Sequence, residues 1–273
     1  MSGRFPFMAA IRRRVPVVTT TLGIAAGVAL LLALMTVWFG FYDVAATTKH
    51  SPPVEWLLHF VMQRSVAAHA PELQVPDLND ANLILRGALH YSSGCAPCHG
   101  APGELASPIA QQMTPVPPAL YGAWKDFDPS QLFWIIQNGV KLTAMPAWPA
   151  QQRSDEIWAM VAFVEHLRTL TTPDYLALVR NTHTNWLPAP PTTTPSGFDA
   201  AACARCHGED GRGRSGVAPA LAGHNEAELE AALRAFRDGS TASGFMQPVA
   251  AQLSDPQILE AARYYASLPP GAQ

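Results

Sequence analysis

Two short runs of cysteine and histidine have the residue types and the spacing to perform chemistry. They are residues 95–99, Cys-Ala-Pro-Cys-His, and residues 203–207, Cys-Ala-Arg-Cys-His, and they contain all four cysteines of the chain. Four cysteines could form a zinc site, two redox dithiols or disulfides in an oxidising compartment. None of these uses requires a histidine directly after each pair. Cys-x-x-Cys-His is instead the attachment signature of haem c, whose vinyl groups bond the thiols and whose iron binds the imidazole.

The sequence therefore predicts two haem c groups, each holding one iron. Each iron receives one axial ligand from the histidine of its motif. The residues predicted to attach the haems are Cys95, Cys98 and His99 in the first motif and Cys203, Cys206 and His207 in the second.

A second axial donor is needed on the other side of each iron. Met246 is the only methionine after the second motif, whereas Met113, Met145 and Met160 compete after the first. Met160 shares an apolar helical stripe, where core packing is the better explanation. Met113 follows the first motif too closely to pass around the haem edge. We therefore predict Met145, beside a proline between two helices, and Met246, in the loop at residues 243–248, as ligands.

Each motif opens one copy of an internal duplication. After the motif, each copy continues with a proline-rich loop, an amphipathic helix, an irregular loop holding the methionine, and a closing helix. Strand-like alternation of useful length is absent, so we expect an all-α protein with two small helical domains. The helices around the methionine loops are predicted at residues 130–140 and 155–170 in the first copy and at 226–237 and 256–268 in the second.

A proline-rich stretch at residues 187–195 separates the copies, and its prolines favour an extended spacer. The predicted organisation is a cytoplasmic tail and transmembrane anchor (1–42), a periplasmic connector (43–76), a first haem domain (77–172), a linker (173–197) and a second haem domain (198–273).

The anchor is predicted from a run without charged side chains across residues 15–42. This run exceeds the roughly 20 residues that span a hydrocarbon core. Arg12, Arg13 and Arg14 precede it and aromatic residues lie at its end, at positions 38–42, which indicates a cytoplasmic N-terminus. We expect a single-pass helix in the inner membrane with the haem domains in the periplasm. A cleaved signal peptide is the alternative, although signal peptides have apolar regions of only about 7–15 residues.

The connector contains a stretch with helical spacing of its apolar residues at 54–68. His50, His59 and His69 lie within or beside it, but no cysteine or paired carboxylate joins them at metal-ligand spacing. We expect these histidines to face solvent or to cap helix ends.

Composition excludes one class of partner. Charged residues make up 14% of the 273 residues, and the formal net charge is −3. The first 40 residues carry arginines without acids, while the rest of the chain is acidic on balance. No basic face for nucleic acid is evident, so we expect no nucleic-acid partner.

Each copy resembles a class I cytochrome c domain, and the tandem resembles the dihaem c-type cytochromes of bacterial periplasms. The resemblance covers roughly residues 81–170 and 198–270. It implies that a glycine and an aromatic residue of the first helix pack against an aromatic residue of the last helix. The residues that fit are Gly87 and Tyr91 for the first helix, and Phe163 and Tyr264 for the last helix of the two copies.

The resemblance also implies a proline carbonyl that holds the far nitrogen of each haem histidine. Pro117 or Pro118 fits this role in the first copy, and Pro219 fits it in the second. Two departures accompany the match. The second copy has almost no room for a first helix before its motif, and its loop from the motif to Pro219 is short, so we expect this copy to be trimmed or to lean on its neighbour.

With histidine and methionine on both sides, an iron has no open position for a substrate. We therefore expect an electron-transfer protein of the respiratory chain, not an enzyme. By analogy with the family, its redox partners would be a quinol-oxidising complex or dehydrogenase and a terminal oxidase. Two alternatives stay open. The chain could be the haem-bearing subunit of a larger dehydrogenase or oxidase, or, if His166, His224 or an open position replaces a methionine, a dihaem peroxidase.

Overall fold

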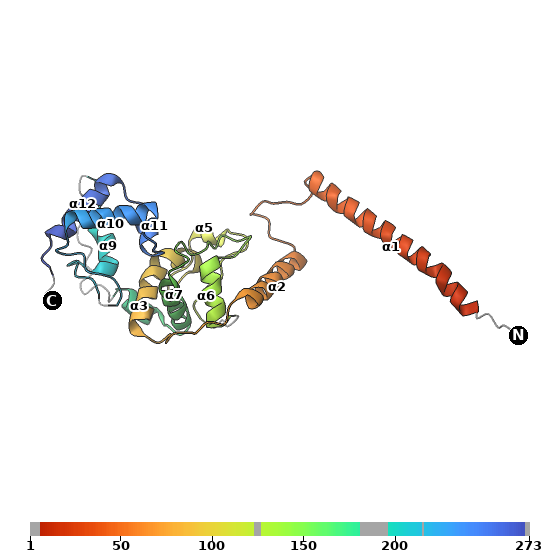
Figure 1. Cartoon of the computed structure of the whole chain (residues 1–273), viewed down its shortest axis with the longest axis horizontal. Coiled ribbons are helices and arrows are strands. Elements are labelled where there is room, and N and C mark those ends of the chain that lie inside the picture. The colour runs from red at the N-terminus through yellow and green to blue at the C-terminus, as the bar shows by residue number, and fades with distance from the viewer. Residues whose placement is uncertain (1–5, 123–126, 181–195, 215, 271–273) are drawn as a thin grey trace. The chain divides into compact units, whose positions relative to one another are not determined.

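Helices form the regular structure of the computed structural model, which describes residues 6–122, 127–180, 196–214 and 216–270 (Figure 1). Within these ranges extended backbone pairs only in two isolated bridges, at Ala101 with Glu104 and at Arg214 with Ala218. The predicted all-α class is confirmed. The spacer predicted at 187–195 lies outside the described residues.

The first unit of the chain, Met1–Lys49, is built around the long helix α1 (Pro6–Trp38). Its segment Thr19–Trp38 has 20 residues, is strongly apolar, and has no part buried against the rest of the unit. At about 1.5 Å per residue this segment is long enough to cross a hydrocarbon core of about 30 Å. The helix ends before Gly40, whose φ of 66° lies in the left-handed region that stops a helix.

The second unit, His50–Gln273, begins with α2 (Pro52–His69). Pro52 and Pro53 occupy its first turn, where an amide hydrogen has no helical partner. The helix therefore starts two residues earlier than predicted. Val66 is buried and the His69 ring lies 6.1 Å from that of Trp134, so the end of α2 packs on the first copy. The N-terminal part of α2 exposes large apolar side chains, at Trp56, Leu57, Phe60 and Val61.

The first copy consists of α3 (Ala81–His90), the π-helical turn η1 (Tyr91–Cys95), α4 (Ala96–His99), α5 (Pro108–Gln111), α6 (Pro129–Asn138), α7 (Ser154–Leu167) and α8 (Thr172–Arg180). Aspartate caps set two of the starts. Asp80 accepts the backbone N–H of Leu83 at 2.8 Å, and Asp128 accepts that of Gln131 at 2.9 Å. The predicted helices at 130–140 and 155–170 correspond to α6 and α7.

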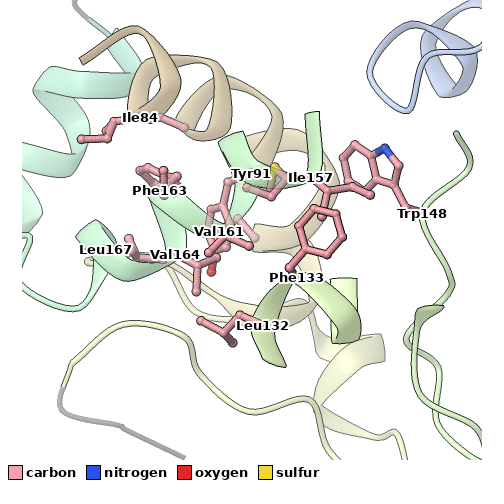
Figure 2. Packing of buried hydrophobic residues seen from close by; sticks show 14 of the residues in the cluster. Ile84, Tyr91, Leu132, Phe133, Trp148, Ile157, Val161, Phe163, Val164 and Leu167 are labelled. Atoms are coloured by element: carbon pink, nitrogen blue, oxygen red, sulfur yellow. The ribbon is translucent and has the colours of Figure 1, made fainter. Parts of the chain in front are cut away.

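The core of the first copy forms where α3 crosses α7. Gly87 permits this crossing, because a Cβ there would lie 2.1 Å from the Ala159 carbonyl oxygen and 2.6 Å from Phe163 Cβ. The rings of Tyr91 and Phe163 have centroids 5.1 Å apart, and both side chains are fully buried. Figure 2 shows them in one cluster with Phe133 of α6. The packing of Gly87, Tyr91 and Phe163 that the resemblance implies is thus present.

Helix α8 occupies the beginning of the range predicted as a linker, 173–197. Tyr175 in this helix is 1% exposed and belongs to the core cluster of the first copy. Packing therefore places these residues with the first copy, beyond the predicted domain end at residue 172.

The second copy consists of α9 (Ala200–His207), α10 (Glu226–Asp238), α11 (Met246–Ala250) and α12 (Asp255–Ser267). Helices α10 and α12 correspond to the predictions at 226–237 and 256–268. Its buried cluster contains only Phe198, Ala261 and Tyr265 among the described residues. Within residues 196–199 no helix equivalent to α3 precedes α9, as the short sequence there predicts.

Candidate haem sites

The first motif lies at the end of α3, where the backbone passes through η1 into the short helix α4. Cys95 ends η1, and Cys98 and His99 follow in α4. Gly100, with a φ of 67°, ends this turn. The Tyr91 hydroxyl donates to the Gly100 carbonyl at 2.7 Å, so the buried tyrosine fixes the exit of the motif to the core.

The imidazole of His99 is held from behind by a proline carbonyl. Its Nδ1 lies 2.7 Å from the carbonyl oxygen of Pro118, which decides between the two predicted prolines. A carbonyl oxygen only accepts hydrogen bonds, so Nδ1 carries the hydrogen and Nε2 keeps a lone pair for a metal. Burial lowers the pKa of His99, against the opposing effect of this hydrogen bond, and favours the neutral ring.

The second motif forms the last turns of α9, and its backbone differs from the first in having no π-helical turn. Asp199 caps the helix by accepting the N–H of Ala201 at 2.9 Å. The Nδ1 atom of His207 lies 2.9 Å from the carbonyl oxygen of Pro219, as predicted. Burial also lowers the pKa of His207. Two different local backbones thus produce the same arrangement, a neutral imidazole whose Nε2 is available.

The cysteines form no disulfide in the structure. All four are free thiols of intermediate exposure. Burial raises the pKa of Cys95 to about 12 and that of Cys203 to about 11, and it raises the pKa of Cys206 as well. A redox dithiol needs a lowered thiol pKa, so these environments do not favour that use.

A metal site of protein ligands alone has no support in the described part of the chain. There, no three histidine, cysteine, aspartate or glutamate side chains gather in a set that could hold an ion. This includes the connector histidines His50, His59 and His69. The donor set of each motif, two thiols and one oriented imidazole, instead fits a haem c.

The predicted methionine ligands lie in different local structures. Met145 is half-buried in the loop between α6 and α7, where its carbonyl oxygen accepts the Val140 N–H at 3.2 Å. Met246 is the first residue of α11, so the prediction of an irregular loop at this position is wrong. Met160 is 1% exposed in the core of the first copy, consistent with the packing role assigned to it. Met145 and Met246 as ligands stay predictions.

The two alternative donors are both on the surface. His166 is exposed near the end of α7, and His224 is exposed before α10.

The aromatic support of the second motif differs from the expectation. Tyr264, which the resemblance assigns to it, is 37% exposed, although its ring lies 6.1 Å from that of Phe198. The neighbouring Tyr265 is 3% exposed, and its hydroxyl lies 3.4 Å from the carbonyl oxygen of Ala200. Sequence reasoning missed Tyr265, which the spacing Ile258, Ala261, Tyr265 on one helical face could have indicated.

Glu156 is a second residue that sequence reasoning missed. It lies at the start of α7 and is 1% exposed, with its carboxylate held by several donors. Acidic residues are ordinary in a first helical turn, which conceals it. The available signal is its place on the same face as Met160, Phe163 and Leu167, an apolar stripe.

Two stretches of the chain, residues 82–164 and 192–264, match one protein family, described as cytochrome c oxidase, cbb3-type, subunit III. Each stretch contains one of the Cys-x-x-Cys-His motifs, and together the stretches make up more than half of the chain. No solved structure matches the chain.

Similar proteins include three bacterial ones. Cytochrome c-554(548) of Halomonas halodenitrificans is 41% identical over 68 residues, which are 24% of this chain and 82% of that protein. The thiosulfate dehydrogenase electron acceptor of Thiomonas intermedia is 34% identical over 42% of this chain, and the match spans 50% of its length. Cytochrome c-552 of Acidithiobacillus ferridurans is 26% identical over 65% of this chain and 74% of its own length.

Two motifs with oriented imidazoles, a helical fold around each, and a match over more than half of the chain lead to one conclusion. This chain belongs to the cytochrome c family described as cytochrome c oxidase, cbb3-type, subunit III, whose members carry haem c and transfer electrons.

Proposed function

We propose that this protein is a membrane-tethered periplasmic electron carrier with two haem c groups. The observation that carries the proposal is the repeated arrangement of a thiol pair and a histidine whose Nδ1 is held by a proline carbonyl, at 2.7 and 2.9 Å. The residues proposed to hold the first haem are Cys95, Cys98, His99 and Met145, and those for the second are Cys203, Cys206, His207 and Met246.

The thiols, the histidine and the methionine of each copy would together hold a haem c. A haem c held this way supplies a one-electron iron couple, and a methionine ligand raises its potential. The thiols would hold it covalently, the proline carbonyl fixes the imidazole tautomer, and the half-buried methionine would offer a soft sulfur donor. Because histidine and methionine would occupy both axial positions, the sites favour electron transfer over substrate turnover.

The proposed location rests on α1 and on the next helix, α2. The segment Thr19–Trp38 has the length and composition of a membrane span, and arginines precede it in the sequence. Within the second unit, α2 exposes Trp56 and Phe60, whose rings stack with centroids 5.5 Å apart. Exposed aromatic side chains that come soon after a span in the sequence suit the interface between membrane and water.

The proposed partners are a quinol-oxidising complex or a dehydrogenase as the electron donor, and a terminal oxidase as the acceptor. One relative supports a dehydrogenase donor, since its name describes it as the electron acceptor of thiosulfate dehydrogenase. A second candidate function is a haem-bearing subunit of an oxidase. The description of the matched family, a subunit of an oxidase, favours it.

Haem stoichiometry tests the core of the proposal. The full chain, produced with haem-attachment machinery, should gain the mass of two haems. Replacing both cysteines of either motif by serine should leave one haem, and the remaining haem should still cycle between oxidised and reduced states. One haem on the unaltered chain would contradict the proposal, and rapid turnover of hydrogen peroxide would favour the peroxidase alternative.

Purification in a mild detergent separates the carrier from the subunit. A free carrier should elute without stoichiometric partners and should be reoxidised by added membranes that contain a terminal oxidase. Co-elution with other oxidase subunits in fixed proportion would instead establish the second candidate.

A further inference from the structure

A short loop of the second copy, residues 242–245 directly before α11, lies against the core of the first. The Phe245 ring contacts the His90 ring, with centroids 4.7 Å apart, and the Trp148 ring at 5.7 Å. Arg86 lies over the same phenylalanine, with its Cζ 5.8 Å from the ring centroid. The second copy has only a small core of its own. Packing Phe245 against the first copy therefore gives the second copy apolar contacts that its own core does not provide.

The buried carboxylate of Glu156 holds this loop. Its Oε1 accepts the Ser243 hydroxyl at 2.7 Å and pairs with the Arg153 guanidinium at 3.1 Å. Its Oε2 accepts the Gly244 N–H at 2.6 Å and the Trp148 indole N–H at 3.2 Å. A charge that is 1% exposed is costly unless it is paired, and these four donors, from both copies, satisfy both oxygens.

The same network reaches the two predicted methionine ligands. In the second copy, the Ser243 hydroxyl oxygen accepts the backbone N–H of Met246 at 3.0 Å while its hydrogen goes to Glu156. In the first copy, Trp148 lies three residues after Met145 in the same loop. Figure 2 shows Trp148 at the margin of the first cluster.

Close packing leaves the loop little freedom. A Cβ on Gly244 would lie 2.2 Å from the Trp148 ring, so the backbone of the second copy rests directly on an indole of the first. Glu156 thus stands between one loop that presents Met145 and another that presents Met246.

We propose that Glu156 is a positioning residue that joins the two copies and fixes Met246 for its iron through the Ser243 hydroxyl. The inference rests on the proposed function, in which Met246 is an axial ligand. It goes beyond that function by making the ligation of the second iron depend on a side chain of the first copy.

Two substitutions interrupt the network at different points. Glu156→Gln keeps the side-chain size but replaces one of the two acceptor oxygens by an NH₂ group. The two protein groups that donate to that oxygen would then have no acceptor there. Ser243→Ala removes the hydroxyl that links the carboxylate to the Met246 backbone. Ser240→Ala is the matched control, because this exposed serine lies just before the loop and, among the described residues, bonds to Ala235 and Asp238 of its own copy.

The readout is the weak red-region absorption of oxidised histidine- and methionine-ligated haem, followed during heating of the full-length holoprotein in detergent. In Glu156→Gln and Ser243→Ala, about half of this band should disappear at a lower temperature than in Ser240→Ala. In both variants one of the two haem midpoint potentials should also fall. The double variant should lose the band no earlier than Glu156→Gln alone, because both changes act on the same link.

Two results would overturn the inference. One is a band and a pair of potentials in both variants that match those of Ser240→Ala; if Glu156→Gln does not load haem, Ser243→Ala decides alone. The other is an unchanged band in Met246→Ala, which would also remove this methionine from the proposed site. Loss of half the band in Met246→Ala with no effect of the other two variants would refute the role of Glu156 only.

Discussion

At the scale of single residues, the sixth ligands are the sharpest test of the proposed sites. Replacing Met145 or Met246 by alanine should remove one haem's share of the red-region absorption and lower that haem's potential, because water or histidine then takes the sulfur position. Met160→Leu is the control, since this methionine is 1% exposed in the core of the first copy and is not one of the predicted ligands. Absorption and potentiometric titration measure both effects. A variant with an unchanged spectrum would exclude its methionine as a ligand.

Covalent chemistry dictates the spacing of the residues that we predict to attach each haem. The two cysteines and the histidine of each motif must fit one porphyrin edge, so their roles can be predicted from the sequence. Pro118 could not be separated from Pro117 without the fold, because only the path of the loop decides which carbonyl meets His99. Glu156 was missed because two of its four donors, Ser243 and Gly244, lie 87 and 88 residues away in the sequence.

At the scale of elements, the crossing of α3 and α7 depends on Gly87. Helix propensity alone predicts that Gly87→Ala stabilises the protein by about 1 kcal/mol. The contacts predict the opposite sign, since the new methyl group would meet the backbone of Ala159 at 2.1 Å. We expect a loss of about 1–3 kcal/mol, as for other overpacked cores. Denaturant unfolding of the holoprotein measures the change, and a more stable variant would show that the helices separate without cost.

A second contact between these helices should make stability depend on pH. Asp155 of α7 accepts hydrogen bonds from Arg153 and from Arg86 of α3, and these partners hold its pKa far below its ordinary value. A depressed pKa in the folded state contributes stability above the unfolded pKa of about 3.9 and loses it as the pH falls. The side chain is 49% exposed, so solvent screening limits the effect to about 0.5–1 kcal/mol.

The corresponding variant is Asp155→Asn. It should unfold more easily than the unaltered protein at pH 7, and the difference should shrink as the pH falls below about 4. Asp210→Asn removes the same charge from a carboxylate that is 61% exposed and 3.7 Å from its arginine, and it should have little effect. Equal sensitivity of the two variants at pH 7 would show that net charge, and not the contact between α3 and α7, sets the pH dependence.

Helices were predictable where a local pattern determines them. The four helices around the methionine loops follow from apolar spacing, and capping residues such as Asp128 set their starts. Helix α8 was not predicted because it depends on burying Tyr175 in the first copy, a contact between distant segments. Helix α11 was not predicted because its five residues are too few to show a helical period.

At the scale of the whole molecule, the two copies share a motif but not a core. The first copy buries Tyr91 against Phe163 of α7. The second copy has no counterpart of α3 among its described residues, and its Phe245 packs on the first copy instead. The short sequence before the second motif predicts this dependence in outline. The contact around Phe245 could not be predicted, because it joins a loop of the second copy to side chains from α3, from the loop before α7 and from α7 of the first copy.

The last prediction concerns α1, whose role as an anchor or a cleaved signal decides whether the carrier is free to diffuse. Its segment Thr19–Trp38 can span a membrane, and a signal sequence near an N-terminus would share that property. We expect the mature protein to retain residues 1–42, because a 20-residue apolar segment is longer than the roughly 7–15 residues usual in signal peptides.

Intact mass and alkaline extraction of membranes distinguish the two roles. An anchored chain should keep its full polypeptide mass plus two haems and should stay in the membrane pellet. As a matched control, a chain in which a cleavable signal replaces residues 1–42 should appear in the soluble periplasm with both haems. Recovery of the unaltered protein from the soluble fraction, shortened by its N-terminal segment, would show that α1 directs export and that the two haem-bearing copies then work without a tether.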